Sequence, residues 1–253
     1  MISRGELKEI YFKKESAPLG AYPFSLPFFN QTDKLTIHPS VTFFVGENGT
    51  GKSTLTEAIA VACGFNPEGG SFNFNFNTFA SHSILYKYLR TSRGVHRHTD
   101  GFFLRGESFF NVATEIENLD IDEPGSASPP KIIDNYGGKS LHQQSHGESF
   151  WALFMKRFGG NGLYILDEPE AALSPTRQMA MLVRMHQLIE QRSQFIIATH
   201  SPILIAYPNA IVYEFSADGI ERKPYHQTGV FNTYKRFLSD TENMIDQLLN
   251  EDY

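Results

Sequence analysis

The feature that most constrains this chain is one glycine-rich run: Gly46, Glu47, Asn48, Gly49, Thr50, Gly51, Lys52, Ser53 and Thr54. It follows the strand-like run Val41–Val45, and it precedes a segment whose apolar residues recur at helical spacing. Glycines let a backbone wrap an anion with no Cβ in the way, and the N-terminal end of a helix directs free N–H groups at it. The combination predicts a phosphate-binding loop between a buried strand and a helix.

Two residues of this loop have distinct expected roles. Lys52 is expected to contact the β and γ phosphates of a nucleoside triphosphate, and Ser53 to give its hydroxyl to Mg²⁺. A glycine-rich surface loop that only resembles the pattern is the alternative. The strand before it and the helix after it argue against that alternative, so we expect nucleotide binding.

A pair of carboxylates follows a second apolar run. Asp167 and Glu168 come directly after Leu163–Leu166, where α/β sheets place their ligand chemistry, and Pro169 ends the strand. We expect Asp167 to hold the Mg²⁺ shell through water and Glu168 to orient the water that attacks the γ phosphate. Two adjacent acids are most often a solvated turn, but the apolar run and the phosphate-binding loop favour a site.

A histidine follows a third apolar run, Phe195–Ala198. His200 precedes Ser201 and Pro202, a cap and first-turn pair for another helix. This places His200 at the same rim as Glu168, where it can hydrogen-bond the γ phosphate or the attacking water. A structural histidine is the alternative.

The run Ser145-His146-Gly147-Glu148-Ser149 begins a predicted helix. Ser145 can donate a hydroxyl, and Gly147 permits close approach of a phosphate to the helix N-terminus. Ser145 and Glu148 also fit a capping box, and both readings are compatible.

The order of these motifs resembles that of the ABC-type ATPases over about residues 35–205. The run at 145–149 stands where that family has its signature motif, Ala171–Ser174 in the place of the D-loop, and His200 in the place of the switch histidine. His146 departs from the commonest signature, Ser-Gly-Gly-Gln, and Glu148 resembles the DNA-repair branch. The resemblance implies ATP and Mg²⁺ as ligands. It also implies a homodimer in which Ser145, Gly147 and Glu148 of one copy contact the nucleotide on the loop of the other.

Two family elements are less clear. The glutamine that touches Mg²⁺ in the family has no plain match, and Glu107 is the substitute we expect. An aromatic residue stacking on adenine would come from the N-terminal strands, where Tyr22 and Tyr11 are the candidates.

Composition narrows the class further. The chain has 253 residues, 41% of them hydrophobic, which suits one domain with a full core. It has neither an apolar run of membrane-spanning length nor a signal-like N-terminus, so a cytoplasmic location without membrane insertion is expected. Cys63 is expected to be a buried hydrophobe.

Charge and histidine spacing limit the expected ligands. The formal charge of −6 argues against a broad nucleic-acid surface. The best local basic cluster is Arg90, Arg93, Arg97 and Arg105. The histidines lack the companions and spacing of a metal centre, so no metal other than Mg²⁺ is expected.

The expected fold is α/β, a P-loop NTPase with a mainly parallel central sheet, an N-terminal antiparallel β-subdomain and a small helical lobe. Residues 1–40 supply edge strands, with runs at Ile10–Phe12, Tyr22–Phe24 and Leu35–Ile37. Residues 41–80 and 160–225 form the nucleotide-binding core, and 81–159 the helical lobe with a flexible loop at 120–131. A last acidic amphipathic helix around Phe237–Leu249 is expected to pack on the core, with binding of a partner as the alternative.

The function expected is ATP hydrolysis by a small standalone bacterial-type ATPase. ATP would close a homodimer that acts on a soluble partner, either DNA or an effector protein. The stretch between loop and signature is too short for a long coiled coil. Two alternatives stay open: an ATP-dependent switch or scaffold with negligible turnover, and the nucleotide-binding subunit of an ABC transporter.

Overall fold

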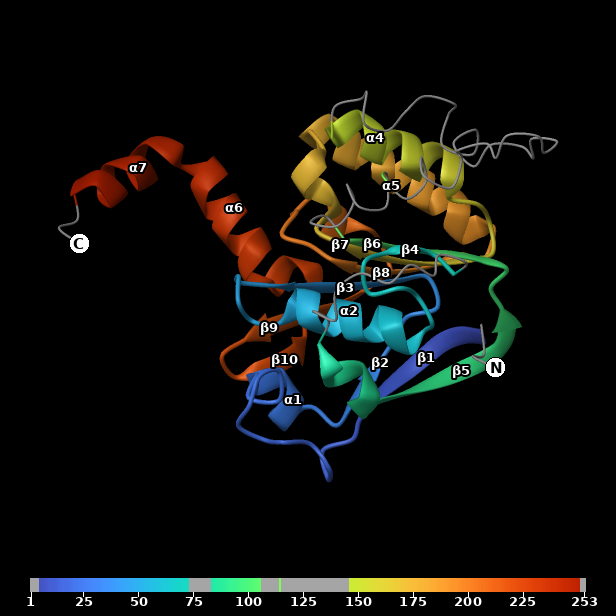
Figure 1. Cartoon of the computed structure of the whole chain (residues 1–253). Coiled ribbons are helices and arrows are strands. Elements are labelled where there is room, and N and C mark those ends of the chain that lie inside the picture. The colour runs from blue at the N-terminus through green and yellow to red at the C-terminus, as the bar shows by residue number, and fades with distance from the viewer. Residues whose placement is uncertain (1–4, 73–82, 106–113, 115–145, 251–253) are drawn as a thin grey trace.

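The computed structural model describes residues 5–72, 83–105, 114 and 146–250 (Figure 1). Its central sheet has seven strands in the order β10-β9-β3-β8-β7-β6-β4. The five inner strands are parallel: β3 (Val41–Gly46), β6 (Asp100–Arg105), β7 (Gly162–Asp167), β8 (Gln194–Ala198) and β9 (Ile211–Ser216). The edge strands β4 (Gly70–Ser71) and β10 (Gly219–Arg222) are antiparallel to their neighbours. The expected α/β class with a mainly parallel sheet is confirmed.

The central strands are buried on both faces, as continuous apolar runs require. Along β3, Val41, Phe43 and Val45 face one hydrophobic cluster, whereas Phe44 faces the other. Side chains of a strand alternate between its faces, so each buried strand contributes to both layers of the core. Parallel strands buried in this way bring all their carboxyl ends to one edge of the sheet.

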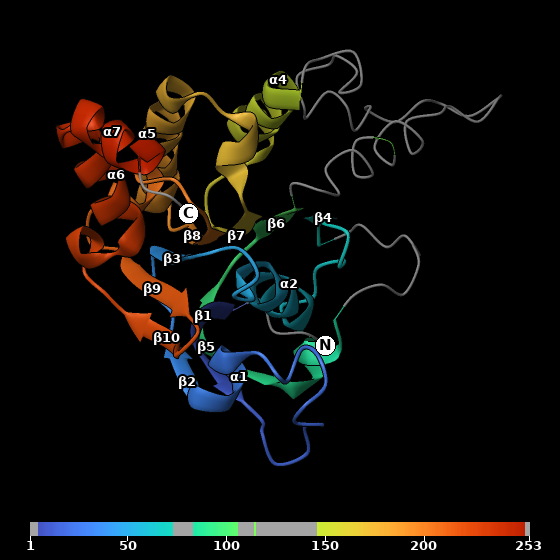
Figure 2. The same ribbon diagram turned by 90° about the vertical axis from the view of Figure 1, so that its left-hand side faces the viewer.

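Helices cover the two faces. On one face lies α2 (Lys52–Ala62), between the central sheet and a three-stranded antiparallel sheet (Figures 1 and 2). On the other face lie α4 (His146–Ala152), the π-helical turn Leu153–Arg157 and α5 (Pro175–Glu190). The smaller sheet has the order β2-β1-β5 and consists of β1 (Gly5–Phe12), β2 (Lys34–Thr36) and β5 (Leu89–Arg97). Short helical turns complete the fold: α1 (Pro27–Gln31), η1 (Ile84–Tyr88), η6 (Pro169–Ala172), η7 (Leu204–Ala206) and η8 (Tyr225–Gln227).

The expected antiparallel N-terminal unit is present, but its composition differs from the prediction. Tyr22–Phe24 forms turns leading into α1 rather than a strand. The third strand is β5, which comes from the range expected to form the helical lobe, and β6 also lies in that range. Strand β5 carries four arginine or histidine side chains among its nine residues, so its pattern lacked an apolar run. The expected loop at 120–131 lies outside the described residues.

The C-terminal segment contradicts the prediction of one helix packed on the core. Two helices form instead, α6 (Gly229–Ser239) and α7 (Thr241–Asn250), and neither contains a buried residue. Figure 1 shows them projecting from the body. Among the described residues, no helix combines the length and apolar character that crossing a bilayer requires.

The hydroxyl of Tyr164 on β7 joins this strand to the turn that precedes it. It lies 2.8 Å from Asp100 Oδ2 and 2.7 Å from Gly159 O, and it accepts a hydrogen bond of 2.8 Å from Gly159 N. Its ring stacks on Phe158 at 4.2 Å. We expect Tyr164→Phe to lower the free energy of unfolding by about 1–3 kcal/mol, because buried polar groups lose their partner.

Urea unfolding of the purified chain measures this loss. Tyr207→Phe is the matched control, because the Tyr207 hydroxyl bonds the exposed His186 ring and its removal should change stability by less than about 0.5 kcal/mol. Equal stabilities of the two variants would contradict the assigned role of Tyr164.

Candidate functional site

The loop between β3 and α2 depends on glycine at two positions. Gly46 and Gly51 have φ angles of 135° and 95°, which L side chains rarely adopt. A Cβ on Gly46 would collide with the backbone of Phe215, and one on Gly51 would lie 2.5 Å from the Phe28 ring. The loop geometry therefore requires these glycines both for conformation and for close packing.

Lys52 is held inside the loop that it follows. Its ammonium group donates hydrogen bonds of 2.9 Å to the carbonyls of Gly46 and Glu47, and the residue is only 4% exposed. Burial lowers the pKa of Lys52, and nearby carboxylates, first Glu168 and then Asp167, oppose that shift. The lysine thus places a positive charge at the centre of the loop, where a phosphate would lie.

Ser53 and Asp167 meet across the edge of the sheet. Ser53 Oγ donates a hydrogen bond of 3.0 Å to Asp167 Oδ1, and Asp167 is 7% exposed at the end of β7. Burial, aided by the neighbouring Glu168, raises the pKa of Asp167 to about 7. A hydroxyl and a carboxylate are oxygen donors of the kind that Mg²⁺ takes beside nucleotide phosphates, so these residues fit that ion.

Glu168 and His200 face each other at the same rim. Glu168 adopts the left-handed conformation with φ 50° and ψ 51°, and its backbone N–H donates to Ala198 O at 2.9 Å. His200 Nε2 lies 3.6 Å from Glu168 Oε1, and it has no hydrogen-bond partner in the described part of the chain. Strained backbone conformations cluster at functional sites. The two side chains are 43% and 35% exposed, so the site is open on this side.

Glu170 belongs to the site and was missed in the sequence. Its Oε1 accepts a hydrogen bond of 2.5 Å from the backbone N–H of His200, which fixes the start of the loop after β8. Burial raises the pKa of Glu170. Its place just past the Asp167-Glu168 pair was the available signal, but nothing local indicates a contact 30 residues along the chain.

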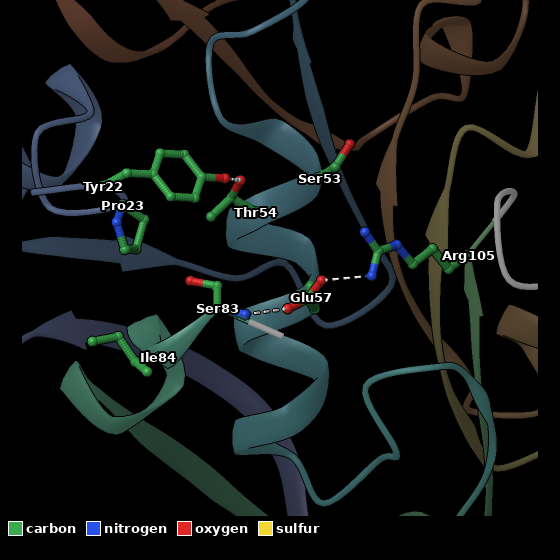
Figure 3. Close-up of a pocket in the computed structure, with 8 residues that line it drawn as sticks. All are labelled: Tyr22, Pro23, Ser53, Thr54, Glu57, Ser83, Ile84 and Arg105. Atoms are coloured by element: carbon green, nitrogen blue, oxygen red, sulfur yellow. Dashed lines mark hydrogen bonds and ion pairs between the residues drawn. The ribbon is translucent and has the colours of Figure 1, made fainter. Parts of the chain in front are cut away.

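A cavity of about 550 Å³ flanks the N-terminal half of α2 (Figure 3). Across it, Arg105 Nη1 binds Glu57 Oε2 at 2.8 Å, and the hydroxyl of Tyr22 lies 2.7 Å from Thr54 Oγ1. The cavity also touches Ser53, which places it beside the phosphate loop. Its lining residues are Tyr22, Pro23, Ser53, Thr54, Glu57, Ser83, Ile84 and Arg105.

The cavity distinguishes between the two tyrosines that were candidates for stacking on adenine. Tyr22 lines it, whereas Tyr11 lies on β1, bonds Glu9 at 2.6 Å and carries the Arg90 guanidinium 4.7 Å from its ring centroid. Arg105 does not belong to the basic cluster that was expected to contain it and Arg90. It lies on β6, in register with Asp167 of β7. The cluster of four arginines is therefore not one surface.

The signature region is described only in part. Ser145 and Glu107 lie outside the described residues. Gly147 and Glu148 lie in the first turn of α4, which begins at His146, and Glu148 is exposed. A Cβ on Gly147 would lie 2.5 Å from Ala172 O, so this glycine also serves packing against η6 of the same chain.

Two family models match separate parts of the sequence. One, described as "AAA domain", matches residues 25–117, and the other, described as "AAA domain, putative AbiEii toxin, Type IV TA system", matches residues 140–206. No curated protein matches the chain. The AAA-type matches contain the phosphate loop and the Asp167–His200 region respectively.

Solved structures share the fold at low identity. A structure titled "An inward-facing conformation of a putative metal-chelate type ABC transporter" is 16% identical, with a TM-score of 0.50 over 90% of this chain and 88% of that one. The SMC head domain from Thermotoga maritima is 15% identical, with a TM-score of 0.42 over 87% and 99%. A dimeric ATP-binding cassette bound to ADP and Pi is 16% identical, with a TM-score of 0.47 over 77% and 90%. The chain has the fold of a small P-loop ATPase and resembles ABC-type ATPases.

The buried carboxyl of Asp167 generates a pH prediction for the protein without Mg²⁺ or nucleotide. Its folded pKa of about 7 exceeds the ordinary value of 3.8, so the folded state binds more protons than the unfolded state between these values. The free energy of unfolding should therefore fall as pH rises from about 4 to 7. Asp167→Asn should remove this contribution, so its stability relative to wild type should increase across that window.

Urea unfolding at pH 5, 6, 7 and 8 in the presence of a chelator measures the difference. Asp218→Asn, at an exposed hairpin turn, is the control and should keep the wild-type slope. A stability difference between wild type and Asp167→Asn that is constant with pH would contradict the raised pKa.

Proposed function

We propose that this protein binds ATP with Mg²⁺ and hydrolyses it. The observation that carries the proposal is the hydrogen bond between Ser53 and Asp167, with Glu168 and His200 beside it. It joins a helix N-terminus that can bind phosphate to a strand end that can supply carboxylates. The three motifs lie far apart in the sequence, yet the fold gathers them at one edge.

Each residue of this edge has a proposed task. Lys52 exchanges its two loop carbonyls for the β and γ phosphates, while the loop N–H groups hold the phosphate oxygens. Ser53 and Asp167 hold Mg²⁺, which when bound neutralises charge on the phosphates. Glu168 accepts a hydrogen bond from the attacking water and orients it toward the γ phosphate. His200, fixed by Glu170, bonds the γ phosphate or that water through Nε2.

The open side of the site supports a homodimer. The Glu168 and His200 side chains are partly exposed, whereas phosphoryl transfer is favoured where bulk water is excluded. We propose that a second copy covers the site on ATP binding and contributes Ser145, Gly147 and Glu148 at the start of its α4. Glu107 stays a proposed Mg²⁺ contact.

We further propose that the protein acts in the cytoplasm on a soluble partner, either DNA or an effector protein. The resemblance of Glu148 to the DNA-repair branch supports this choice over a transporter subunit. Copurification with membrane subunits would favour the transporter reading instead.

Phosphate release tests the hydrolysis proposal. With Mg-ATP, the wild type should release phosphate, and Glu168→Gln should lose at least about 100-fold in rate while still binding ATP, because only the orienting base is removed. Both are measured with and without DNA. A wild-type rate no higher than that of Glu168→Gln would refute the proposal that the protein hydrolyses ATP. The nucleotide-dependent switch would then be the favoured function.

The cavity beside Thr54 predicts where the base binds. Tyr22→Ala should weaken ATP binding by about tenfold or more in titration calorimetry, because base stacking on an aromatic ring contributes about 1–3 kcal/mol. Tyr22→Phe should keep most of the affinity. Tyr11→Ala is the control, since that ring already packs against Arg90; a loss as large as that of Tyr22→Ala would contradict the assignment.

A further inference from the structure

The C-terminal arm, defined as α6 and α7, is anchored at its start to the part of the body that the structure describes. Gly229 N donates a hydrogen bond of 2.6 Å to Glu214 Oε1, and the Phe231 ring packs on Tyr225 at 4.7 Å. Beyond that point the arm leaves the body, as Figure 1 shows, and none of its residues is buried.

Both helices of the arm carry an apolar face. In α6 the face runs through Phe231, Tyr234 and Leu238, of which the last two are 49% and 71% exposed. In α7 its members recur at i, i+1, i+4 and i+5: Met244, Ile245, Leu248 and Leu249. Such a face normally packs on other apolar surface. Ile245, Leu248 and Leu249 are instead 42%, 42% and 79% exposed.

The two helices cannot cover each other within one chain. A single residue, Asp240, separates Ser239 from Thr241, whereas two antiparallel helices need a connection of about 2–5 residues. Apart from Val230 at the start of α6, which packs against the core, the described residues of the body leave the arm uncovered as well. A second copy of the chain can supply the cover.

The charged residues beside the two apolar faces are complementary, basic on α6 and acidic on α7. At 100° per residue, Lys235 borders the apolar face of α6, and its Nζ lies 5.8 Å from the Phe231 ring centroid. Glu242 borders the apolar face of α7 on the corresponding side, and Asp246 lies one turn along on the same flank, further from the face. When two such helices pack antiparallel, corresponding flanks meet, so Lys235 of one helix lies beside the acids of the other.

The arm also starts close to the nucleotide edge. Glu214, which anchors it, is in register with Val45, the residue before the phosphate loop. A partner held by the arm would therefore stay near that edge, at a raised effective concentration.

We propose that the arms of two copies pair reciprocally, α6 of each copy antiparallel to α7 of the other, and hold a homodimer without nucleotide. The contact is isologous, because each copy gives one basic and one acidic helix. This inference does not depend on ATP binding or hydrolysis. It adds a permanent link between the two copies to the ATP-dependent contact proposed above.

Light scattering and sedimentation of the full chain without nucleotide test it. The wild type should be a dimer, and Leu238→Glu should raise the dissociation constant by about tenfold or more, because a carboxylate then lies in the apolar contact. Lys235→Glu should weaken the dimer, as should Glu242→Lys with Asp246→Lys, and the three changes combined should restore it. Arg236→Glu, the same charge change on the opposite side of α6, is the control and should leave the dimer intact.

A monomer at all concentrations without nucleotide overturns the inference, and so does a dimer that Leu238→Glu leaves unchanged. Failure of the charge reversals to restore the dimer overturns the antiparallel register. Circular dichroism and urea unfolding of each variant show that the body is folded. If the protein is a dimer without nucleotide but releases no phosphate from ATP, only the proposed ATPase activity is refuted. If the dimer forms only with ATP and the arm variants do not change it, only the proposed pairing of the arms is refuted.

Discussion

The hydrogen bond from Ser53 to Asp167 joins residues 114 positions apart, and the geometry of the site depends on it. It exists because β3, β8, β7 and β6 are parallel neighbours whose carboxyl ends share one edge. The registers that place Asp167 opposite Ala198 on one side and Arg105 on the other also bring His200 and the cavity to that edge. Small changes in strand register would therefore separate the phosphate loop from its carboxylates.

Much of this edge could be predicted from the sequence, because the evidence there is local. A buried strand is a continuous apolar run, and its last residues are polar, so Asp167, Glu168 and His200 are each visible next to their own strand. Two features could not be predicted in this way. Glu170 holds the backbone of His200, and Glu57 pairs with Arg105, through contacts that only the assembled sheet creates. Strand β5 was missed because pairing with β1, rather than its own pattern, makes it a strand.

The arm shows a second limit of sequence reasoning. Helical spacing identified an apolar face near the C-terminus, but spacing alone does not identify what covers that face. The prediction of core packing was wrong because α6 leaves the body after Phe231, and the one-residue link at Asp240 directs α7 further away. An uncovered apolar face of this length is unfavourable in water, so the arm's charges and connection become the evidence for its partner.

Charge at the phosphate loop links metal binding to protonation. Lys52 lies among Glu47, Asp167, Glu168 and Glu170, and burial raises the pKa of Asp167 to about 7. If Asp167 holds Mg²⁺ as proposed, it would do so as the ionised carboxylate, so metal binding should release a proton from Asp167 when the pH is near or below that value. In the proposed function, Ser53 would exchange its hydrogen bond to Asp167 for the ion, and Lys52 would exchange its carbonyls for phosphates. The atoms that make these contacts within the loop would then be the ones that bind the ligand, so binding would replace one set of bonds with another.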